Sequence, residues 1–145
     1  MRNRTKLFLA IFMLGATPVA ALAQDAGDPA KGEKLAKKCM VCHQIGDSRK
    51  VVIGPNLTGV IGRQAGTAEG YRASKLSKAA GEAGLVWTEE LIVQYLPNPK
   101  EFITNFLKEA GKADEAKGAY KMPVSFKKEE DNRDIAAYLK SLSGK

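Results

Sequence analysis

Two cysteines and a histidine, spaced as Cys39, Cys42 and His43, constrain this chain more than any other feature of its sequence. On a helical turn, positions i, i+3 and i+4 share one face, so both thiols and the imidazole can reach the same ligand. This spacing is the one that attaches haem c. The two thiols form thioethers with the haem vinyl groups, and the histidine supplies a ring nitrogen to the iron. We therefore expect one haem c, bound covalently through the two cysteines and ligated by His43.

Three other uses of the cysteine pair fit the sequence less well. A structural zinc site usually takes four Cys or His ligands, but the chain has two cysteines and one histidine, so carboxylates would have to complete the site. A thioredoxin-like redox pair belongs in alternating strand and helix patterns, and this chain shows little strand signal. A disulfide between Cys39 and Cys42 would close a very short loop, stabilise little and leave His43 without a role.

The amino-terminal segment has the plan of a secretory signal peptide. Arg2, Arg4 and Lys6 precede an apolar stretch over residues 7–23, which ends in Ala-Leu-Ala. A positive start, a short apolar core and an A-x-A type cleavage site are typical of such signals. A retained membrane anchor is the alternative, but the apolar core is interrupted by glycine, threonine and proline and falls short of the ~20 residues that a span needs. We expect residues 1–23 to be removed and residues 24–145 to form one monohaem domain.

Export agrees with the haem motif, because haem c is attached outside the bacterial cytoplasm. The expected location is therefore the periplasm, as a soluble protein. Cleavage would remove three positive charges and no acidic residue, which lowers the formal net charge from +7 to +4. The mature protein stays basic, but export and the absence of a basic-aromatic binding motif argue against nucleic acid as its partner.

Helical patterns occupy both ends of the predicted domain. Asp28 followed by Pro29 is typical of a helix start, and apolar positions then recur at helical spacing up to the haem motif. Gly32, inside this first helix, either lowers the stability of the helix without a structural role or marks the point where another helix crosses closely. The crossing partner is expected near the C-terminus, where apolar residues recur at i, i+3, i+4 and i+7. These residues are Ile135, Tyr138, Leu139 and Leu142.

Two more helices are expected between these ends. Thr88 is a candidate N-cap for a helix that Pro97 stops, and Asn98 is a candidate N-cap for a further short helix from Pro99. Residues 45–86 are rich in glycine and polar side chains, so we expect long loops there, with one short helix near residues 71–80. The fold class is therefore all-α, as a single small domain in which helices and long loops enclose a haem that replaces part of the core.

The second iron ligand is expected to be Met122. The chain has one histidine, which excludes bis-histidine ligation within the chain. Pro123 biases Met122 toward an extended backbone, as suits a ligand on a loop; a gap-filling core role is the alternative. The other methionines are Met1 and Met13 in the signal segment and Met40 in the haem motif. With His43 and Met122 both on the iron, one-electron transfer is expected, without bond chemistry at the metal.

The ordered motifs of the chain resemble those of the class I c-type cytochromes, most closely the bacterial cytochrome c2 group. The resemblance covers nearly all of the predicted mature chain. Besides the haem motif, it rests on Gly54-Pro55-Asn56-Leu57, Gly59-Val60-Ile61-Gly62-Arg63, Trp87, Tyr95, Asn98-Pro99-Lys100, Lys121-Met122 and the C-terminal helical pattern. It implies the class I cytochrome c fold, with crossing N- and C-terminal helices, and an electron-transfer protein rather than an enzyme.

The resemblance also implies partners for the haem ligands. The Pro55 carbonyl would accept a hydrogen bond from His43, which fixes the tautomer of the ring. Arg63 and Trp87 would hydrogen-bond a haem propionate, and Tyr95 would approach the sulfur of the methionine ligand. Plain aromatic packing is the alternative for Trp87 and Tyr95.

Four positions depart from the pattern of the family. Ala36 stands where an aromatic residue usually faces the crossing of the terminal helices. A tyrosine that often binds a propionate would fall at Ala73, unless Tyr71 replaces it. The segment between residues 103 and 122 is longer than in short members. Val124 stands two places after the methionine ligand, where the family usually has an aromatic residue, and the aromatic here is Phe126.

Lysines that cluster in sequence around the haem ligands predict how the protein meets its partners. These are Lys38, Lys50, Lys121, Lys127 and Lys128. A positive ring around the haem edge would steer a monomeric carrier onto acidic partner proteins in short-lived complexes. The resemblance implies a cytochrome bc-type membrane complex as donor and a photosynthetic reaction centre or terminal oxidase as acceptor.

Two other classes of function remain open from the residues alone. One is an enzyme or its haem subunit, in which Met122 leaves the iron to open a reaction site. The other is a sensor or gas-binding haem protein with His43 as the one protein ligand. Both need the bond between Met122 and iron to be absent or labile, so the strength of that bond decides among the three.

Overall fold

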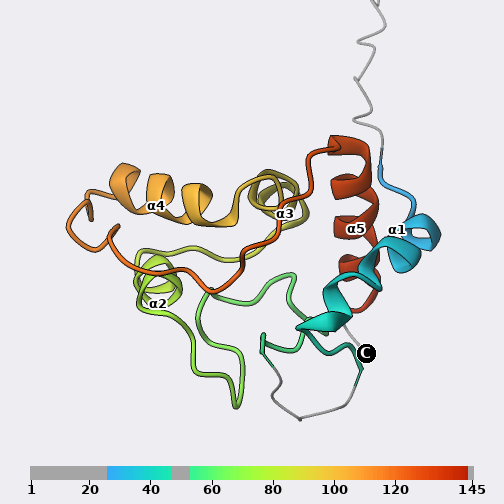
Figure 1. Ribbon diagram of the computed structural model, residues 1–145, viewed down its shortest axis with the longest axis horizontal. Helices are drawn as coiled ribbons and strands as arrows, with labels where there is room; N and C mark the ends of the chain where they lie inside the picture. The colour runs from blue at the N-terminus through green and yellow to red at the C-terminus, as the bar shows by residue number, and fades with distance from the viewer. Residues whose placement is uncertain (1–25, 47–52, 144–145) are drawn as a thin grey trace, which may run out of the picture.

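The computed structural model describes residues 26–46 and 53–143, which form an all-helical domain (Figure 1). Residues from its helices and loops line a cavity. The elements are α1 (Pro29–Ala36), a single 3₁₀ turn η1 (Cys39–Val41), α2 (Lys75–Glu82), α3 (Glu89–Tyr95), α4 (Pro99–Glu109) and α5 (Glu129–Ser141). The predicted all-α class is confirmed, since the pairing of Gln64 with Val86 is an isolated bridge between loops. No helix in these two ranges is long and apolar enough to cross a membrane. The predicted signal peptide, residues 1–23, lies outside the described residues.

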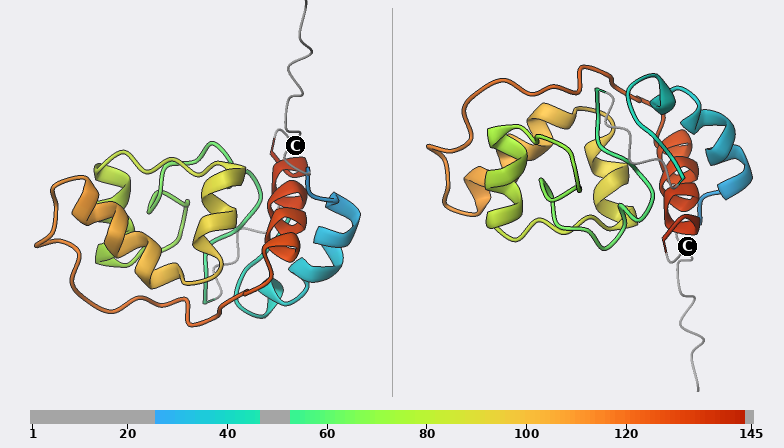
Figure 2. Two further views of the ribbon diagram at one scale, coloured as in Figure 1. Left: turned by 90° about the horizontal axis from the view of Figure 1, so that it is seen from above. Right: turned by 90° about the horizontal axis from the view of Figure 1, so that it is seen from below.

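Helices α1 and α5 cross at close range on one side of the domain, as predicted (Figures 1 and 2). Gly32 is the reason for the short distance: a Cβ at this position would overlap the backbone carbonyl of Asp134 and lie 2.8 Å from the Tyr138 Cβ. Ala36, one turn further on, is 1% exposed. Two small residues on one face therefore let α5 approach α1, which explains how the crossing forms without the aromatic residue usual at position 36.

The start of α1 is tied to α5 as well as capped from within. The Asp28 carboxylate accepts hydrogen bonds from the backbone N–H groups of Ala30 and Lys31, which is the contact that an N-cap residue makes. The Asp28 N–H in turn donates to the carboxylate of Asp134, 2.6 Å away, and Asp134 is buried. The haem motif that follows α1 is thereby held to the C-terminal helix.

Helices α2 and α3 line the cavity through Ser77, Ile92 and Tyr95, and α4 packs against both of these helices. Thr88 caps α3 and Asn98 caps α4, as predicted, and each side chain accepts a backbone N–H from the first turn. Helix α2 begins four residues later than predicted, because the Ser74 hydroxyl accepts the Ser77 N–H and so defines the first turn. The fully buried core that these helices share comprises Leu76, Leu85, Ile103, Leu107 and Ile135.

The long loop before α2 supplies much of the remaining wall of the cavity. Its residues pair with the segment before α3: the Gly62 N–H donates to the Trp87 carbonyl and the Trp87 N–H to the Arg63 carbonyl. The Ala65 N–H donates to the Leu85 carbonyl. These bonds place Arg63 and Trp87 around the same cavity although they lie far apart in the sequence.

Candidate functional site

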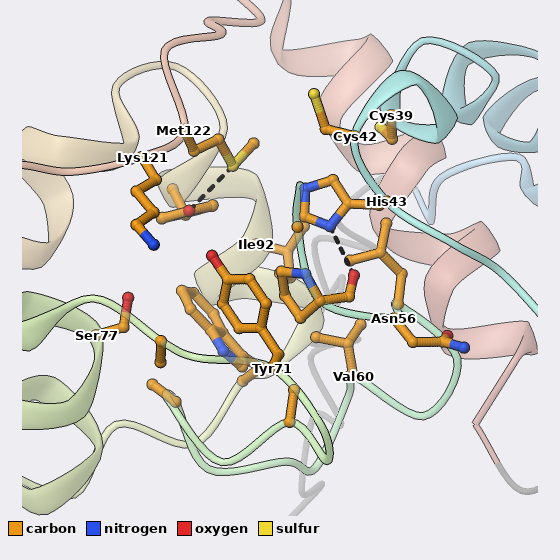
Figure 3. Close-up of a pocket in the computed structure, with 18 of the residues that line it drawn as sticks. Cys39, Cys42, His43, Asn56, Val60, Tyr71, Ser77, Ile92, Lys121 and Met122 are labelled. Carbon is orange, nitrogen blue, oxygen red and sulfur yellow. Dashed lines mark hydrogen bonds between the residues drawn. The ribbon is translucent and has the colours of Figure 1, made fainter. Parts of the chain in front are cut away.

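The cysteine pair and the histidine enter the cavity from one tight turn. The N–H groups of Cys42 and His43 both donate to the Cys39 carbonyl, at 3.0 and 2.9 Å. The turn is 3₁₀ rather than α-helical, but it still brings both thiols and the imidazole to the cavity wall (Figure 3). Cys39 and Cys42 are not joined in a disulfide, and burial raises the pKa of the Cys39 thiol. Two thiols and an imidazole are therefore presented together to whatever fills the cavity.

His43 is held in one orientation and one tautomer. Its Nδ1 lies 2.8 Å from the Pro55 carbonyl oxygen, the contact that the resemblance implied. Burial lowers the pKa of His43, more than the Pro55 carbonyl raises it, so the ring is neutral at pH 7. A neutral ring that donates from Nδ1 carries its lone pair on Nε2. Gly54 leaves room for this ring, because a Cβ there would lie 2.6 Å from the imidazole Cε1.

Met122 brings a sulfur atom to the same cavity from the loop before α5 (Figure 3). The Tyr95 hydroxyl donates to this sulfur at 3.1 Å, the approach that the resemblance implied. The hydroxyl of Tyr120 lies 2.8 Å from that of Tyr95. Burial raises the pKa of Tyr95 well above its ordinary value and also raises that of Tyr120, so both remain protonated phenols at neutral pH.

Arg63 lines the cavity, but its guanidinium is largely engaged by the loop itself. It donates to the carbonyls of Asn56 and Thr58, both at 2.9 Å, and to that of Gly59 at 3.3 Å. This residue therefore holds the loop that carries the histidine's carbonyl partner. The Trp87 ring packs edge-on against Tyr95, with centroids 4.8 Å apart. The propionate contacts expected for Arg63 and Trp87 stay predictions.

The cavity fits a large flat apolar ligand. The space between its walls is about 1360 Å³, part of which is open to solvent at the mouth. Its wall is mainly apolar and includes Leu57, Val60, Ile92, Leu96 and Leu139. Thiols, imidazole and thioether, the donor set that haem c requires, all reach this space. The residues present therefore suit a covalently bound haem.

Three residues of the cavity wall had no definite role in the sequence-based predictions. Tyr71 and Ala73 both line the cavity, so the tyrosine displaced from the usual position still reaches it. Tyr120 was missed. The signal for it was its place two residues before Met122 in an extended segment, because side chains at i and i+2 of such a segment point to the same face.

Comparison with known proteins identifies the family. The cytochrome c family model matches residues 29–143. The chain is 54% identical over 117 residues to cytochrome c2 iso-2 of Rhodospirillum centenum, covering 81% of this chain and 97% of that protein. It is 49% identical over 115 residues to a cytochrome c2 of Rhodopseudomonas palustris, covering 79% and 98%.

Comparison with solved structures gives the same family. The solved structure of cytochrome c2 from Rhodospirillum centenum superposes with a TM-score of 0.78 at 54% identity, covering 81% of this chain and 99% of that one. One haem c attached through the two cysteines follows from this relation together with the two free thiols in the cavity. The chain therefore belongs to the cytochrome c family, and within it to the cytochrome c2 group of haem c electron-transfer proteins.

Proposed function

We propose that this protein is a soluble periplasmic one-electron carrier whose haem iron is ligated by His43 and Met122. The proposal rests mainly on two potential ligand atoms at the cavity wall, His43 Nε2 and the Met122 sulfur. The His43 ring is fixed through Nδ1 so that Nε2 is free to bind iron, and the Met122 sulfur is held by the Tyr95 hydroxyl. Bound haem c supplies a reversible Fe(III)/Fe(II) couple, and a thioether ligand favours the reduced state.

The residues around the cavity would limit the chemistry to electron transfer. With an imidazole on one side and a thioether on the other, no iron site is left for a substrate. The apolar wall excludes water, which disfavours the extra charge of the oxidised haem. The Tyr95 contact with Met122 supports a retained ligand, as the carrier needs and a sensor would not.

The first test is an absorption spectrum of the oxidised protein. A bond from thioether sulfur to iron gives a weak far-red charge-transfer band. We expect this band in the wild type and its complete loss in Met122→Ala. Met40→Ala is the matched control, because Met40 lies in the haem motif but is 54% exposed, and it should keep the band. Absence of the band from the wild-type protein would contradict the proposed ligation.

The partners are proposed to be membrane complexes: a cytochrome bc-type donor and a photosynthetic reaction centre or terminal oxidase as acceptor. Export to the periplasm through residues 1–23 would bring the carrier, as a monomer, to their surface. Lys38 and Lys121 are exposed and line the cavity, as do the exposed apolar residues Ile53 and Val124. An apolar centre with a positive rim suits brief docking onto an acidic protein.

Lys127 and Lys128, also predicted to belong to the ring, are not among the residues that line the cavity. Lys127 donates to the Pro97 carbonyl at 3.2 Å, and Lys128 immediately precedes α5. Lys50 lies outside the described residues. Lys38 and Lys121 are therefore the positions at which the docking proposal is best tested.

The second prediction is that electron transfer with a detergent-solubilised cytochrome bc complex slows as ionic strength rises. Reversing both charges, in Lys38→Glu with Lys121→Glu, should lower the rate constant at low ionic strength roughly tenfold and flatten its salt dependence. Lys100→Glu with Lys108→Glu, at two exposed positions on α4, makes the same change in net charge; it is the matched control and should change the rate little. Equal effects of the two reversals would show that net charge, rather than this face, guides the encounter.

A further inference from the structure

Three polar atoms lie in a row beside the proposed iron ligand: the Tyr120 hydroxyl, the Tyr95 hydroxyl and the Met122 sulfur. The oxygens are 2.8 Å apart, and the Tyr95 oxygen is 3.1 Å from the sulfur. A thioether sulfur has no hydrogen and can only accept, while each phenol carries one proton. If Tyr95 donates its single proton to the sulfur, the bond between the two phenols can be made only by the proton of Tyr120.

We infer that Tyr120 is a positioning residue for the methionine ligand: by donating to the Tyr95 oxygen, it directs the Tyr95 proton onto the Met122 sulfur and so raises the reduction potential. The inference rests on the proposed His43 and Met122 ligation. It adds Tyr120 as a residue that acts on the iron through Tyr95 and Met122.

The electronic effect follows from charge. A hydrogen bond to the sulfur withdraws electron density from the lone pairs with which sulfur binds iron. Fe(III) depends on that density more than Fe(II), so the bond disfavours the oxidised state and raises the potential. A donor to the Tyr95 oxygen polarises its O–H group, and in condensed phases such chains strengthen each bond by roughly 10–30%.

Packing holds the row in place. The Tyr95 side chain is 8% exposed, and its ring meets Trp87, Phe102 and Tyr120 edge-on, at centroid distances of 4.8, 5.7 and 6.4 Å. Because the ring cannot swing away, the direction of its proton is the main freedom left. The neighbour that accepts or donates at the Tyr95 oxygen therefore decides where that proton points.

The row continues beyond Tyr120 to the start of α2. The Ser77 side chain acts to lower the pKa of Tyr120, and the hydroxyls of Ser74 and Ser77 are 2.9 Å apart. A proton from Ser77 to the Tyr120 oxygen leaves Tyr120 free to donate to Tyr95. In that arrangement the hydroxyls of Ser77, Tyr120 and Tyr95 would each donate one hydrogen bond and accept one.

The test is a double-mutant cycle of Tyr95→Phe and Tyr120→Phe in the holoprotein, read as the midpoint potential and as the position of the sulfur-to-iron band. We expect Tyr95→Phe to lower the potential and Tyr120→Phe to lower it by a smaller amount. In the Tyr95→Phe background, Tyr120→Phe should have no further effect, because it acts only through Tyr95. Tyr138→Phe, which removes the same atom on α5, is the control and should leave both readouts unchanged.

Three results would overturn the inference. A rise in potential in Tyr120→Phe would mean that Tyr95 had been donating to Tyr120 and turned to the sulfur only on its removal. No change in Tyr120→Phe would show that Tyr120 does not act on the potential, and an equal shift with and without Tyr95 would show that the two hydroxyls act independently. These outcomes are distinct from failure of the proposed ligation, which would appear as a missing far-red band in the wild type.

Discussion

Replacing Met122 by alanine is expected to lower the midpoint potential by at least on the order of 0.1 V, within the ~0.8 V range that haem ligands span. The substitution removes the sulfur that the Tyr95 hydroxyl holds. Water or hydroxide would take its place, and oxygen donors favour Fe(III) where a thioether favours Fe(II). A spectroelectrochemical titration of the purified holoprotein measures the change directly.

The same variant should also bind added imidazole or cyanide rapidly in the oxidised state, because its sixth iron position would be closed only by solvent. The wild type should bind either ligand slowly, after displacement of the sulfur. Met40→Ala again serves as the control and should keep both the potential and the slow binding. An unchanged potential in Met122→Ala would assign the second iron ligand to another residue.

Replacing Gly32 by alanine is expected to destabilise the domain by roughly 2 kcal/mol or more. The added methyl group would overlap the Asp134 carbonyl, which belongs to the backbone of α5 and cannot rotate away. Alanine favours a helix interior over glycine by about 1 kcal/mol, but separating the two helices exposes the core around Ile135, which is 1% exposed. For a domain of this size, Tm should fall by roughly 5–10 °C.

Urea unfolding followed by circular dichroism would measure the loss as a lower midpoint at unchanged slope. Lys34→Ala is the matched control: it places alanine on an exposed position of the same helix and should change the free energy of unfolding by less than about 0.5 kcal/mol. Equal stabilities of the two variants would mean that the helices tolerate a wider separation. The far-red band should persist in Gly32→Ala, since the substitution lies away from the iron ligands.

Helix starts were predictable because an N-cap contact spans only a few residues. Thr88 and Asn98 each accept the N–H three positions later, so the sequence carries the whole interaction. The start of α2 was placed too early. The segment around residues 71–73 makes turns of its own, with the Ala73 N–H donating to the Tyr71 carbonyl, and Ser74 was not recognised as the cap.

The residues of the candidate site likewise fall into two groups: those that a local sequence pattern predicts, and those whose contacts depend on the folded loop. Cys39, Cys42 and His43 lie within one turn, so their spacing alone is enough to predict haem attachment. Arg63 was expected to hydrogen-bond a propionate, but its contacts with the carbonyls of Asn56, Thr58 and Gly59 were not foreseen. They depend on how tightly the loop turns back on its own side chain.

The covalent chemistry of this protein and the ends of most of its helices could be predicted from sequence, because they depend on residues a few positions apart. The choice between the two roles open to Gly32 required the folded chain, since close approach is a property of α1 and α5 together. Only the tertiary structure brought Tyr120 to Tyr95, 25 positions away, beside the Met122 sulfur. Such contacts join separate segments of chain, so their geometry is set by packing and loop path rather than by any local pattern.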